Sequence, residues 1–323
     1  MSQVKQCMNF YHPIDVDPPQ EPVPRKSLQI ISDRLYSVEG NAGKVNDILF
    51  TGFPEAARLN VLYFGGDIQN FTEFMCTDRD CNKFKDEFNL EAIGELLMKR
   101  FNDIHYPVHV WVFRPCKYID SKFVVYNGFL KMNNDGVPSF GTNCMSQDFE
   151  TFTVIPHIRN LLNNSSQLEN EKLGPLYGNI CNPTLPCSVI GFSKGSVILT
   201  KLLIEINSEL TCNCISPFVT LVREMYWLDA SHNGEEDFWP HDYVMFNRIA
   251  SCRMLKGLSF HAYATPFQIG RPIKLKSCQE FSQLTEILLK LGVQNSSGYL
   301  LRGDEINLQT HFDIIKAFPI KRT

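Results

Sequence analysis

A serine between two glycines is the feature of this sequence best suited to chemistry. It lies in the run Gly191-Phe192-Ser193-Lys194-Gly195, which is typical of a nucleophile elbow, a strained strand-to-helix turn that lifts the serine oxygen to the edge of a sheet. The apolar run Cys187–Phe192 predicts a strand before the serine. Apolar residues at helical spacing follow it, at Val197, Ile198, Leu202 and Ile206. We therefore predict that Ser193 is a nucleophile and that Gly191 and Gly195 shape its turn.

A nucleophilic serine needs a general base, and a histidine is the usual one. His311 lies in the run Leu308–Ile315, where a loop meets an amphipathic C-terminal helix, and it is the histidine that we predict. An exposed or helix-capping histidine is the alternative at this position. His261 falls inside a predicted strand and is expected to pack there, whereas His232 could line the site without being the base.

The base in turn needs a carboxylate to orient it, and Asp229 is the predicted acid. It directly follows an apolar run, Met225–Leu228, at the carboxyl end of a strand, the edge where the sites of open α/β sheets collect. Most proteins of α/β-hydrolase fold supply this acid one strand later, but the segment Ser259–Lys276 contains no Asp or Glu. Asp304 is the reserve candidate. The alternative role of Asp229 is to cap the next helix.

The tetrahedral oxyanion of acyl transfer must be met by backbone N–H groups. One comes from the residue after the nucleophile, here Lys194, and the second from the glycine-rich loop at residues 63–67, where Gly66 or Asp67 is the expected donor. A plain turn is the alternative for that loop. The Lys194 side chain could attract an anionic substrate or point into solvent from the first helical turn, and we favour solvent.

The elements that must position these residues alternate between strand and helix. Apolar and alternating runs predict strands at Leu28–Tyr36, Asn46–Thr51, Asn60–Phe64, Val108–Phe113, Cys187–Phe192, Arg223–Leu228, Gly257–Tyr263 and, shorter, near Tyr299–Leu301. Helical periodicity indicates helices at Leu90–Phe101, Phe152–Leu162 and Phe281–Leu291. Such alternation is typical of an α/β fold with a doubly wound, mostly parallel sheet.

The chain divides into a leader and one predicted domain. Residues 1–27 form a Pro-rich leader, and residues 28–323 are expected to form a single α/β-hydrolase-like domain, since no linker separates two cores. Residues 114–186, about a quarter of that domain, read as a lid-like insertion. This insertion contains the turn-like run Asn133-Asn134-Asp135-Gly136 and a predicted loop, Asn163–Pro186.

Composition excludes several classes of function. A formal net charge of -4 with interspersed signs gives no electrostatic footprint for nucleic acid or an anionic membrane, and no apolar run is long enough to span a bilayer. The eleven cysteines, Cys212 and Cys214 among them, match no zinc framework, so we expect no metal and no cofactor. An acidic leader without arginine up to Pro24 favours a cytoplasmic protein over an organellar one.

The runs at Ser188–Gly195, Asn60–Asp67 and Tyr226–Asp229 together resemble a little-characterised eukaryotic family. It is the UPF-type hydrolase-like family of the open reading frame on human chromosome two, and the resemblance extends from about Leu28 to the end of the chain. Phe-Ser-Lys-Gly is its most distinctive stretch. The resemblance implies a serine hydrolase of α/β-hydrolase fold, and for vertebrate members an association with mitochondria through an N-terminal extension. The acidic, Pro-rich leader of this chain departs from that pattern.

These observations predict a serine hydrolase that cleaves a carboxylic ester or thioester, with a small-molecule acyl substrate and the triad Ser193, His311 and Asp229. The alternative is a catalytically silent α/β-hydrolase-like protein that binds or scaffolds a protein partner, because a fold can persist after its site has decayed.

Overall fold

The computed structural model describes the chain from residue 29 to residue 321 with short gaps. The described residues are 29–75, 79–105, 107–140, 154–235, 237–270, 275–292, 295–301, 303 and 305–321. The predicted leader at residues 1–27, the reserve acid Asp304 and the middle of the predicted insertion lie outside them.

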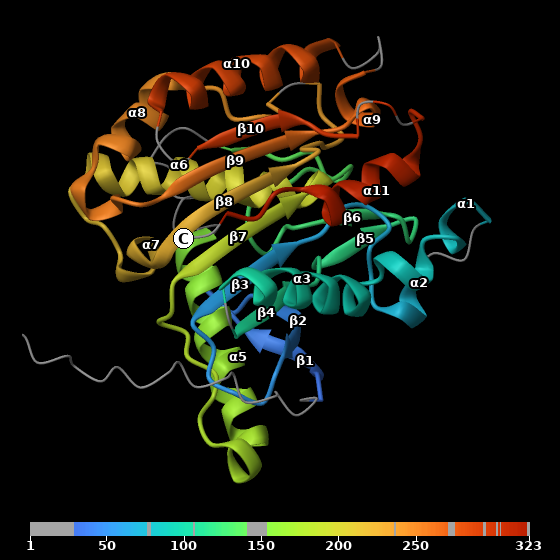
Figure 1. The fold of residues 1–323 in the computed structure, drawn as a ribbon, viewed down its shortest axis with the longest axis vertical. Helices are drawn as coiled ribbons and strands as arrows, with labels where there is room; N and C mark the ends of the chain where they lie inside the picture. The colour runs from blue at the N-terminus through green and yellow to red at the C-terminus, as the bar shows by residue number, and fades with distance from the viewer. Residues whose placement is uncertain are drawn as a thin grey trace, which may run out of the picture.

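The described residues form one eight-stranded sheet (Figure 1). Its order is β1 (Ile31–Glu39), β2 (Val45–Gly52), β4 (Val108–Phe113), β3 (Leu59–Phe64), β7 (Cys187–Phe192), β8 (Val222–Leu228), β9 (Ser259–Ala264) and β10 (Ser296–Tyr299). The pairs β1–β2 and β2–β4 are antiparallel, and every pair from β4 to β10 is parallel. The carboxyl ends of β3, β7 and β8 therefore reach the same edge of the sheet, beside α11 and the β5–β6 hairpin (Figure 1).

Helices cover both faces of the sheet, each over its own apolar core. One core includes α3 (Leu90–His105) and α11 (Leu308–Ala317), and the other includes α5 (Val154–Tyr177), α6 (Ser196–Thr211), α8 (Tyr243–Ser251) and α10 (Leu275–Leu291). Shorter elements are η1 (Thr72–Phe74), α1 (Arg79–Asn82), α2 (Lys85–Phe88), β5 (Lys117–Ile119), β6 (Phe123–Val125), η2 (Ser193–Gly195), α7 (Pro217–Leu221), η3 (Arg253–Leu255) and α9 (Pro266–Ile269). The fold is thus a doubly wound, mostly parallel α/β-hydrolase-like fold.

The central strands are apolar because both of their faces are covered. Every residue of β3, β4 and β7 is buried. A parallel strand between two helix layers has no solvent-facing side, so its sequence is a continuous apolar run and not an alternating one. β1 lies at the edge of the sheet and mixes exposed with buried positions. The continuous apolar sequence of β7 therefore fits its central position between β3 and β8.

The predicted strands and the helices near residues 90 and 281 are confirmed, with shifts of a few residues. The shifts are largest at the ends of the sheet, where β10 begins at Ser296 and not near Tyr299. The predicted loop Asn163–Pro186 is wrong over most of its length, because α5 continues to Tyr177. Asn and Ser at residues 163–166 have low intrinsic helix propensity, but tertiary packing overrides it. Ser165, Ser166 and Leu173 lie on the buried side of α5.

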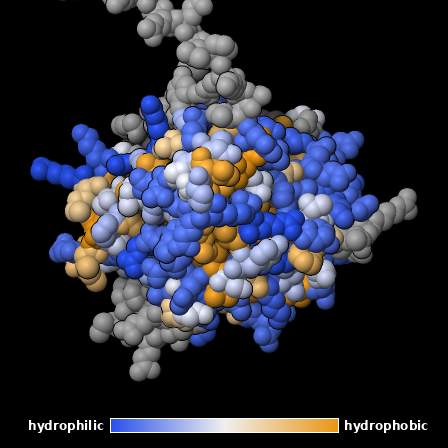
Figure 2. All heavy atoms as spheres, turned by 90° about the horizontal axis from the view of Figure 1, so that it is seen from below, coloured by the Kyte–Doolittle hydropathy of each residue, from blue (hydrophilic) through white to orange (hydrophobic). Residues whose placement is uncertain are grey.

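Within the described ranges no helix combines the length and the apolar character that crossing a bilayer requires. The face seen from below in Figure 2 is mainly hydrophilic, with small hydrophobic areas between charged and polar side chains. Scattered apolar residues of this kind are normal on folded proteins.

Two buried carboxylates lie at α5, one with hydrogen-bond partners and one without. Glu205 of α6 accepts hydrogen bonds from the backbone N–H groups of Val154 and Ile155, at the start of α5. Glu169, in the middle of α5, is fully buried, and neither of its carboxylate oxygens has a hydrogen-bond partner in the described structure. Burial raises the pKa of Glu169 to about 7.

The unpartnered carboxylate predicts a pH-dependent gain in stability for Glu169→Gln. An acid whose pKa is raised by folding binds more protons in the folded state, so its contribution to stability falls as pH rises from about 4.5 to about 7. The stability gained by Glu169→Gln is its free energy of unfolding minus that of the wild type. We expect this gain to be about 2 kcal/mol larger at pH 8 than at pH 5. Chemical denaturation at both pH values measures this. The exposed Glu286→Gln should show no such difference, and an equal effect of Glu169→Gln at both pH values would contradict the prediction.

Candidate active site

Ser193 stands at the carboxyl end of β7 in a left-handed backbone conformation. Its φ angle is 50°, a region that residues with a Cβ atom rarely occupy. The 3-10 turn η2 begins at Ser193, and α6 follows directly from Ser196. The side chain is almost buried, with 6% of the residue exposed. This arrangement of strand, sharp turn and helix is the one that the sequence motif predicts.

The two flanking glycines occupy positions where a side chain has no room. A Cβ atom on Gly195 would lie 2.1 Å from the backbone oxygen of Phe64, at the end of the neighbouring strand β3. A Cβ atom on Gly191 would lie 2.7 Å from the Cα atom of Ser196. The glycines therefore allow the start of α6 to approach β3 and β7 closely, and this approach sets the position of Ser193.

The structure brings two of the predicted residues into direct contact although they lie 82 positions apart. The His311 Nδ1 atom is 2.8 Å from the Asp229 Oδ2 atom, and both residues are buried. Asp229 follows β8 directly and has a φ angle of 46°, which turns the chain at the strand end. His311 lies in the first turn of α11, whose N-cap Asn307 accepts a hydrogen bond from the backbone N–H of Thr310. Because Asp229 takes the Nδ1 side of the ring, the Nε2 atom is left for another partner.

Thr265 holds the Asp229 carboxylate from the end of the next strand. Its backbone N–H donates to Oδ1 and its hydroxyl donates to Oδ2, both at 2.6 Å. Thr265 directly follows β9, which is where most proteins of this fold carry the acid. The threonine thus orients an acid that comes from one strand earlier. The sequence contained no signal for this role, because Thr265 acts only through a residue 36 positions away.

Aromatic rings fix the plane of the His311 imidazole. The ring centroids of Phe192 and Phe267 lie 4.6 Å and 4.8 Å from the imidazole centroid, tilted by 36° and 33°. Phe192 is the residue before Ser193, so the histidine packs directly against the elbow. An imidazole that contacts a carboxylate at one nitrogen and packs against two aromatic rings has little freedom to rotate.

The loop after β3 approaches Ser193, but its hydrogen bonds differ from those expected. A Cβ atom on Gly66 would lie 2.5 Å from the Ser193 Cβ atom, so only glycine fits there. The Gly66 N–H donates to the Gln69 Oε1 atom at 2.9 Å and is not free to meet an oxyanion. Gly66 is therefore unsuited to the donor role, which passes to Asp67, the other candidate. Within the described ranges, the Asp67 backbone N–H takes part in no hydrogen bond.

Residues that the sequence analysis did not single out hold this loop in place. Gln69 Oε1 also accepts from the hydroxyl of Tyr63, and the hydroxyl of Tyr126 donates to the Gly65 carbonyl. The Asp67 carboxylate accepts from the backbone N–H of Val124 on β6, at 2.8 Å. The β5–β6 hairpin, which belongs to the predicted insertion, thus holds the loop after β3 in place. Only the spatial contacts disclose this function, since nothing in the local sequence of the hairpin indicates it.

The Lys194 side chain is buried, and the expectation that it points into solvent is wrong. Only 1% of the residue is exposed, and its Nζ atom has no hydrogen-bond partner within the described ranges. A Cβ atom on Gly136 would lie 2.8 Å from Nζ, so the ammonium group lies against the backbone of the turn at residues 133–136. Burial lowers the pKa of Lys194, and attraction to Asp67 partly opposes that effect.

The rival histidines have other partners. His232 accepts from the Gly234 N–H through Nδ1 and contacts the Asp237 carbonyl through Nε2, so both nitrogens are engaged. His261 lies inside β9, as expected, and stacks on Tyr226 with burial lowering its pKa to about 3. For the described part of the chain, no group of three metal-ligating side chains comes together, and both Cys212 and Cys214 are exposed after α6.

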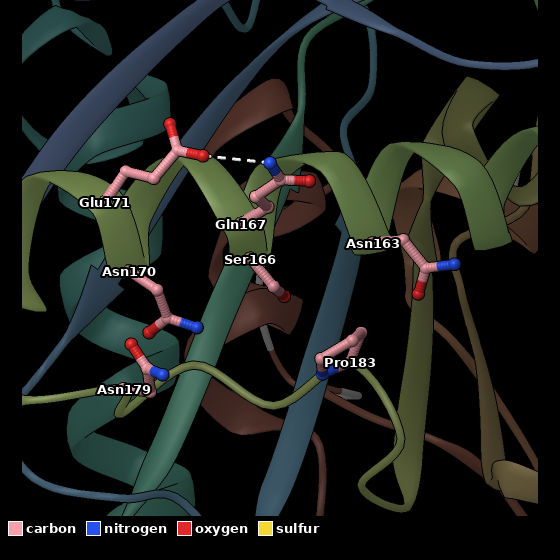
Figure 3. A pocket seen from close by; sticks show the side chains of 7 residues that line it. All are labelled: Asn163, Ser166, Gln167, Asn170, Glu171, Asn179 and Pro183. Carbon is pink, nitrogen blue, oxygen red and sulfur yellow. Dashed lines mark hydrogen bonds between the residues drawn. The ribbon is translucent and has the colours of Figure 1, made fainter.

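Two pockets lie away from Ser193. One, of about 540 Å³, lies between α6, α8 and the loop at 237–242, and is lined by Phe140, Thr200, Ile204, Asn207, Ser208, Thr211, Asp237, Trp239, Pro240, His241, Asp242 and Met245. The other, of about 380 Å³, is a polar hollow between α5 and the segment before β7 (Figure 3). Its lining includes Gln167 and Glu171, which are joined by a hydrogen bond. The first pocket has the more apolar lining. The ring centroid of Phe140, one of its lining residues, lies 6.4 Å from that of His232.

Comparisons with known proteins identify relatives across most of the chain. A family model described as C2orf69 matches residues 34–175 and 179–294. A protein of Danio rerio named mitochondrial protein C2orf69 homolog is 28% identical over 306 residues, which cover 88% of this chain and 85% of that protein. The Homo sapiens protein named mitochondrial protein C2orf69 is 27% identical over 301 residues, which cover 80% of this chain and 74% of that protein.

Solved structures with similar folds include esterases. Esterase Est22 has a TM-score of 0.40 and 11% identity, over 84% of this chain and 71% of that one. Carboxyl esterase 2 of Tuber melanosporum has a TM-score of 0.41 and 11% identity, over 91% of this chain and 84% of that one. Similarity of this degree is too low to support the assignment of the fold, which rests on the strand order.

The left-handed backbone at Ser193 predicts a reversal of the usual ranking of glycine and alanine. Ser193→Gly removes the Cβ atom that strains the turn, whereas Ser193→Ala keeps it, so the glycine variant should be more stable by about 1 kcal/mol. Ser208, in the regular helix α6, is the matched control: there Gly should be less stable than Ala by about 1 kcal/mol. Thermal and chemical unfolding of the four variants measure both differences. The same sign at both positions would show that Ser193 is not strained.

Proposed function

This chain belongs to the C2orf69 family, and we propose that it is a serine hydrolase that cleaves a carboxylic ester or thioester. The single observation that carries the proposal is the contact between His311 Nδ1 and Asp229 Oδ2, at the edge of the sheet where Ser193 stands in its left-handed turn. A buried carboxylate that orients a histidine beside a strained serine is the arrangement that activates a hydroxyl for acyl transfer.

In the proposed first step, the Ser193 oxygen attacks the carbonyl carbon of the substrate, and His311 Nε2 takes the hydroxyl proton. Asp229 stabilises the imidazolium that forms, through the hydrogen bond at Nδ1. The carbonyl oxygen becomes an oxyanion and accepts hydrogen bonds from the backbone N–H groups of Lys194 and Asp67. As the first residues of a helix, Ser193 and Lys194 have backbone N–H groups without partners inside the helix, which favours negative charge there.

In the second step, the bond from carbon to the leaving oxygen or sulfur breaks, and His311 gives its proton to the leaving group. Water then attacks the acyl-serine ester with His311 as base, and the acid product leaves with Ser193 restored. No cofactor takes part in either step. Hydrogen bonds from Thr265 keep the Asp229 carboxylate in place throughout, so this threonine is a positioning residue in the proposal.

We propose the mitochondrion as the compartment of this activity, because the relatives from zebrafish and human are both named mitochondrial proteins. The cytoplasm, which the acidic leader favours, is the competing location. A C-terminal fluorescent fusion of the full chain, imaged with a mitochondrial dye, should colocalise with it. Uniform fluorescence outside mitochondria would contradict this part of the proposal.

Labelling of the purified chain with a fluorophosphonate probe tests the hydrolase. The wild type should become labelled, and Ser193→Ala should lose labelling completely because the attacked oxygen is gone. His311→Ala and Asp229→Asn should each slow labelling by at least about a hundredfold, since they remove the base and the group that orients it. Rates are read from gel fluorescence over time.

His261→Ala serves as the control for loss of a buried histidine, and circular dichroism verifies that every variant is folded. Labelling in that control should proceed at the wild-type rate. A folded wild type that takes up no probe would overturn the hydrolase proposal and favour a silent α/β-hydrolase-like protein that acts by binding a partner.

A further inference from the structure

The side chain of Lys194 has a place in the site that its backbone role does not explain. Its ammonium group is among the most buried polar groups of the chain, with 1% of the residue exposed, and it has no hydrogen-bond partner within the described structure. Removing a cation from water is strongly unfavourable unless a partner compensates. A side chain that could extend into solvent from the first turn of a helix is instead held inside.

Three loops meet around this ammonium group. The turn at residues 133–136 lies against it through Gly136, and that turn is tied to the loop after β8 by a hydrogen bond from Asn233 Nδ2 to the Asp135 carbonyl. Asp67, on the loop after β3, attracts the ammonium electrostatically. Burial lowers the pKa of His232, on the loop after β8, and the positive charge of Lys194 adds to that effect. The group is therefore placed among the loops that surround Ser193 and not on an outer face of α6.

Asp67 does not supply the missing partner. Its Oδ1 atom accepts from the Val124 N–H, and no hydrogen bond joins it to Lys194. Burial raises the pKa of Asp67, and attraction to Lys194 partly opposes that effect. The ammonium is left beside the N-terminal end of α6, where the helix dipole adds further positive potential.

We propose that the Lys194 ammonium group binds a negatively charged group of the substrate, so that the enzyme acts on esters or thioesters that carry an anion next to the scissile bond. The inference rests on the proposed function, since it names the substrate class of the same site. A ligand anion would give the buried cation the charge-assisted hydrogen bond that the protein does not provide. The same anion would be favoured by the start of α6.

The test compares charged and neutral esters within each variant. 4-Nitrophenyl hydrogen glutarate carries the anion on its acyl part and is compared with 4-nitrophenyl hexanoate. 4-Acetoxybenzoate carries it on its leaving group and is compared with methyl 4-acetoxybenzoate. The wild type should favour the charged ester of at least one pair by about tenfold or more in kcat/KM, and the pair that shows the preference identifies the side of the bond.

Lys194→Met should reduce that preference to about one while keeping a side chain of similar length. The ratio cancels any general change in reactivity of the variant. Lys99→Met, which removes the same charge from an exposed position on α3, should keep the wild-type ratio. A wild type that hydrolyses the neutral esters with no preference for either charged ester, or a preference that survives Lys194→Met, would overturn the inference and leave the hydrolase proposal standing.

Binding separates the two proposals if hydrolysis fails. Calorimetry with Ser193→Ala measures affinity for 4-nitrophenyl hydrogen glutarate and for 4-acetoxybenzoate without turnover, and Ser193→Ala combined with Lys194→Met should bind the preferred ester about tenfold more weakly. If the wild type takes up no fluorophosphonate but the double variant still binds the ester more weakly, the hydrolase proposal is refuted. The weaker binding then supports an anion-binding role of Lys194. Equal binding by both variants would assign Lys194 a structural role only.

Discussion

The carbonyl oxygen of Phe64 lies so close to Gly195 that no side chain fits between them, and the site depends on this approach. It brings the start of α6 against the end of β3 and forces Ser193 into a left-handed turn. It also places the Lys194 N–H next to the loop that carries Asp67. Because β3, β7 and β8 are parallel neighbours, the loops that follow them emerge side by side at the same edge of the sheet.

Rigidity at this edge comes from hydrogen bonds that cross between loops. Thr265 holds Asp229, Gln69 holds the Gly66 N–H, and the Tyr126 hydroxyl holds the Gly65 carbonyl. None of these three side chains is proposed to touch a substrate. Thr265 instead fixes the carboxylate that contacts His311, and the other two fix the backbone of the loop after β3, so the geometry is set before any ligand arrives. In the proposed hydrolase, such preorganisation would supply electrostatic stabilisation of the charge that develops during acyl transfer.

Local patterns predict the strands and the strand, turn and helix around Ser193, because periodicity and glycine placement are properties of short segments. They also single out Asp229 and His311, which the structure brings into contact. The positioning residues could not be predicted in this way. Thr265 acts on an aspartate 36 residues away, and Tyr126 acts on a carbonyl 61 residues away. The extension of α5 through Asn163 was missed for the same reason, since packing and not propensity makes that stretch helical.

Lys194 is buried at this same edge of the sheet by a turn that is distant in sequence, so its burial could not be predicted from the neighbouring residues. A lysine in the first helical turn is expected to be exposed, since the helix dipole repels it there. Here the turn that ends at Gly136 lies over the ammonium group, and the positive φ of Gly136, 71°, suits a residue without a side chain. The chain thus tolerates an unpartnered cation and a strained serine at adjacent positions, while the strands beneath them are almost wholly apolar. Unfavourable local features that collect at one edge of a well-packed sheet are what a binding site requires, because a ligand can relieve them there and nowhere else.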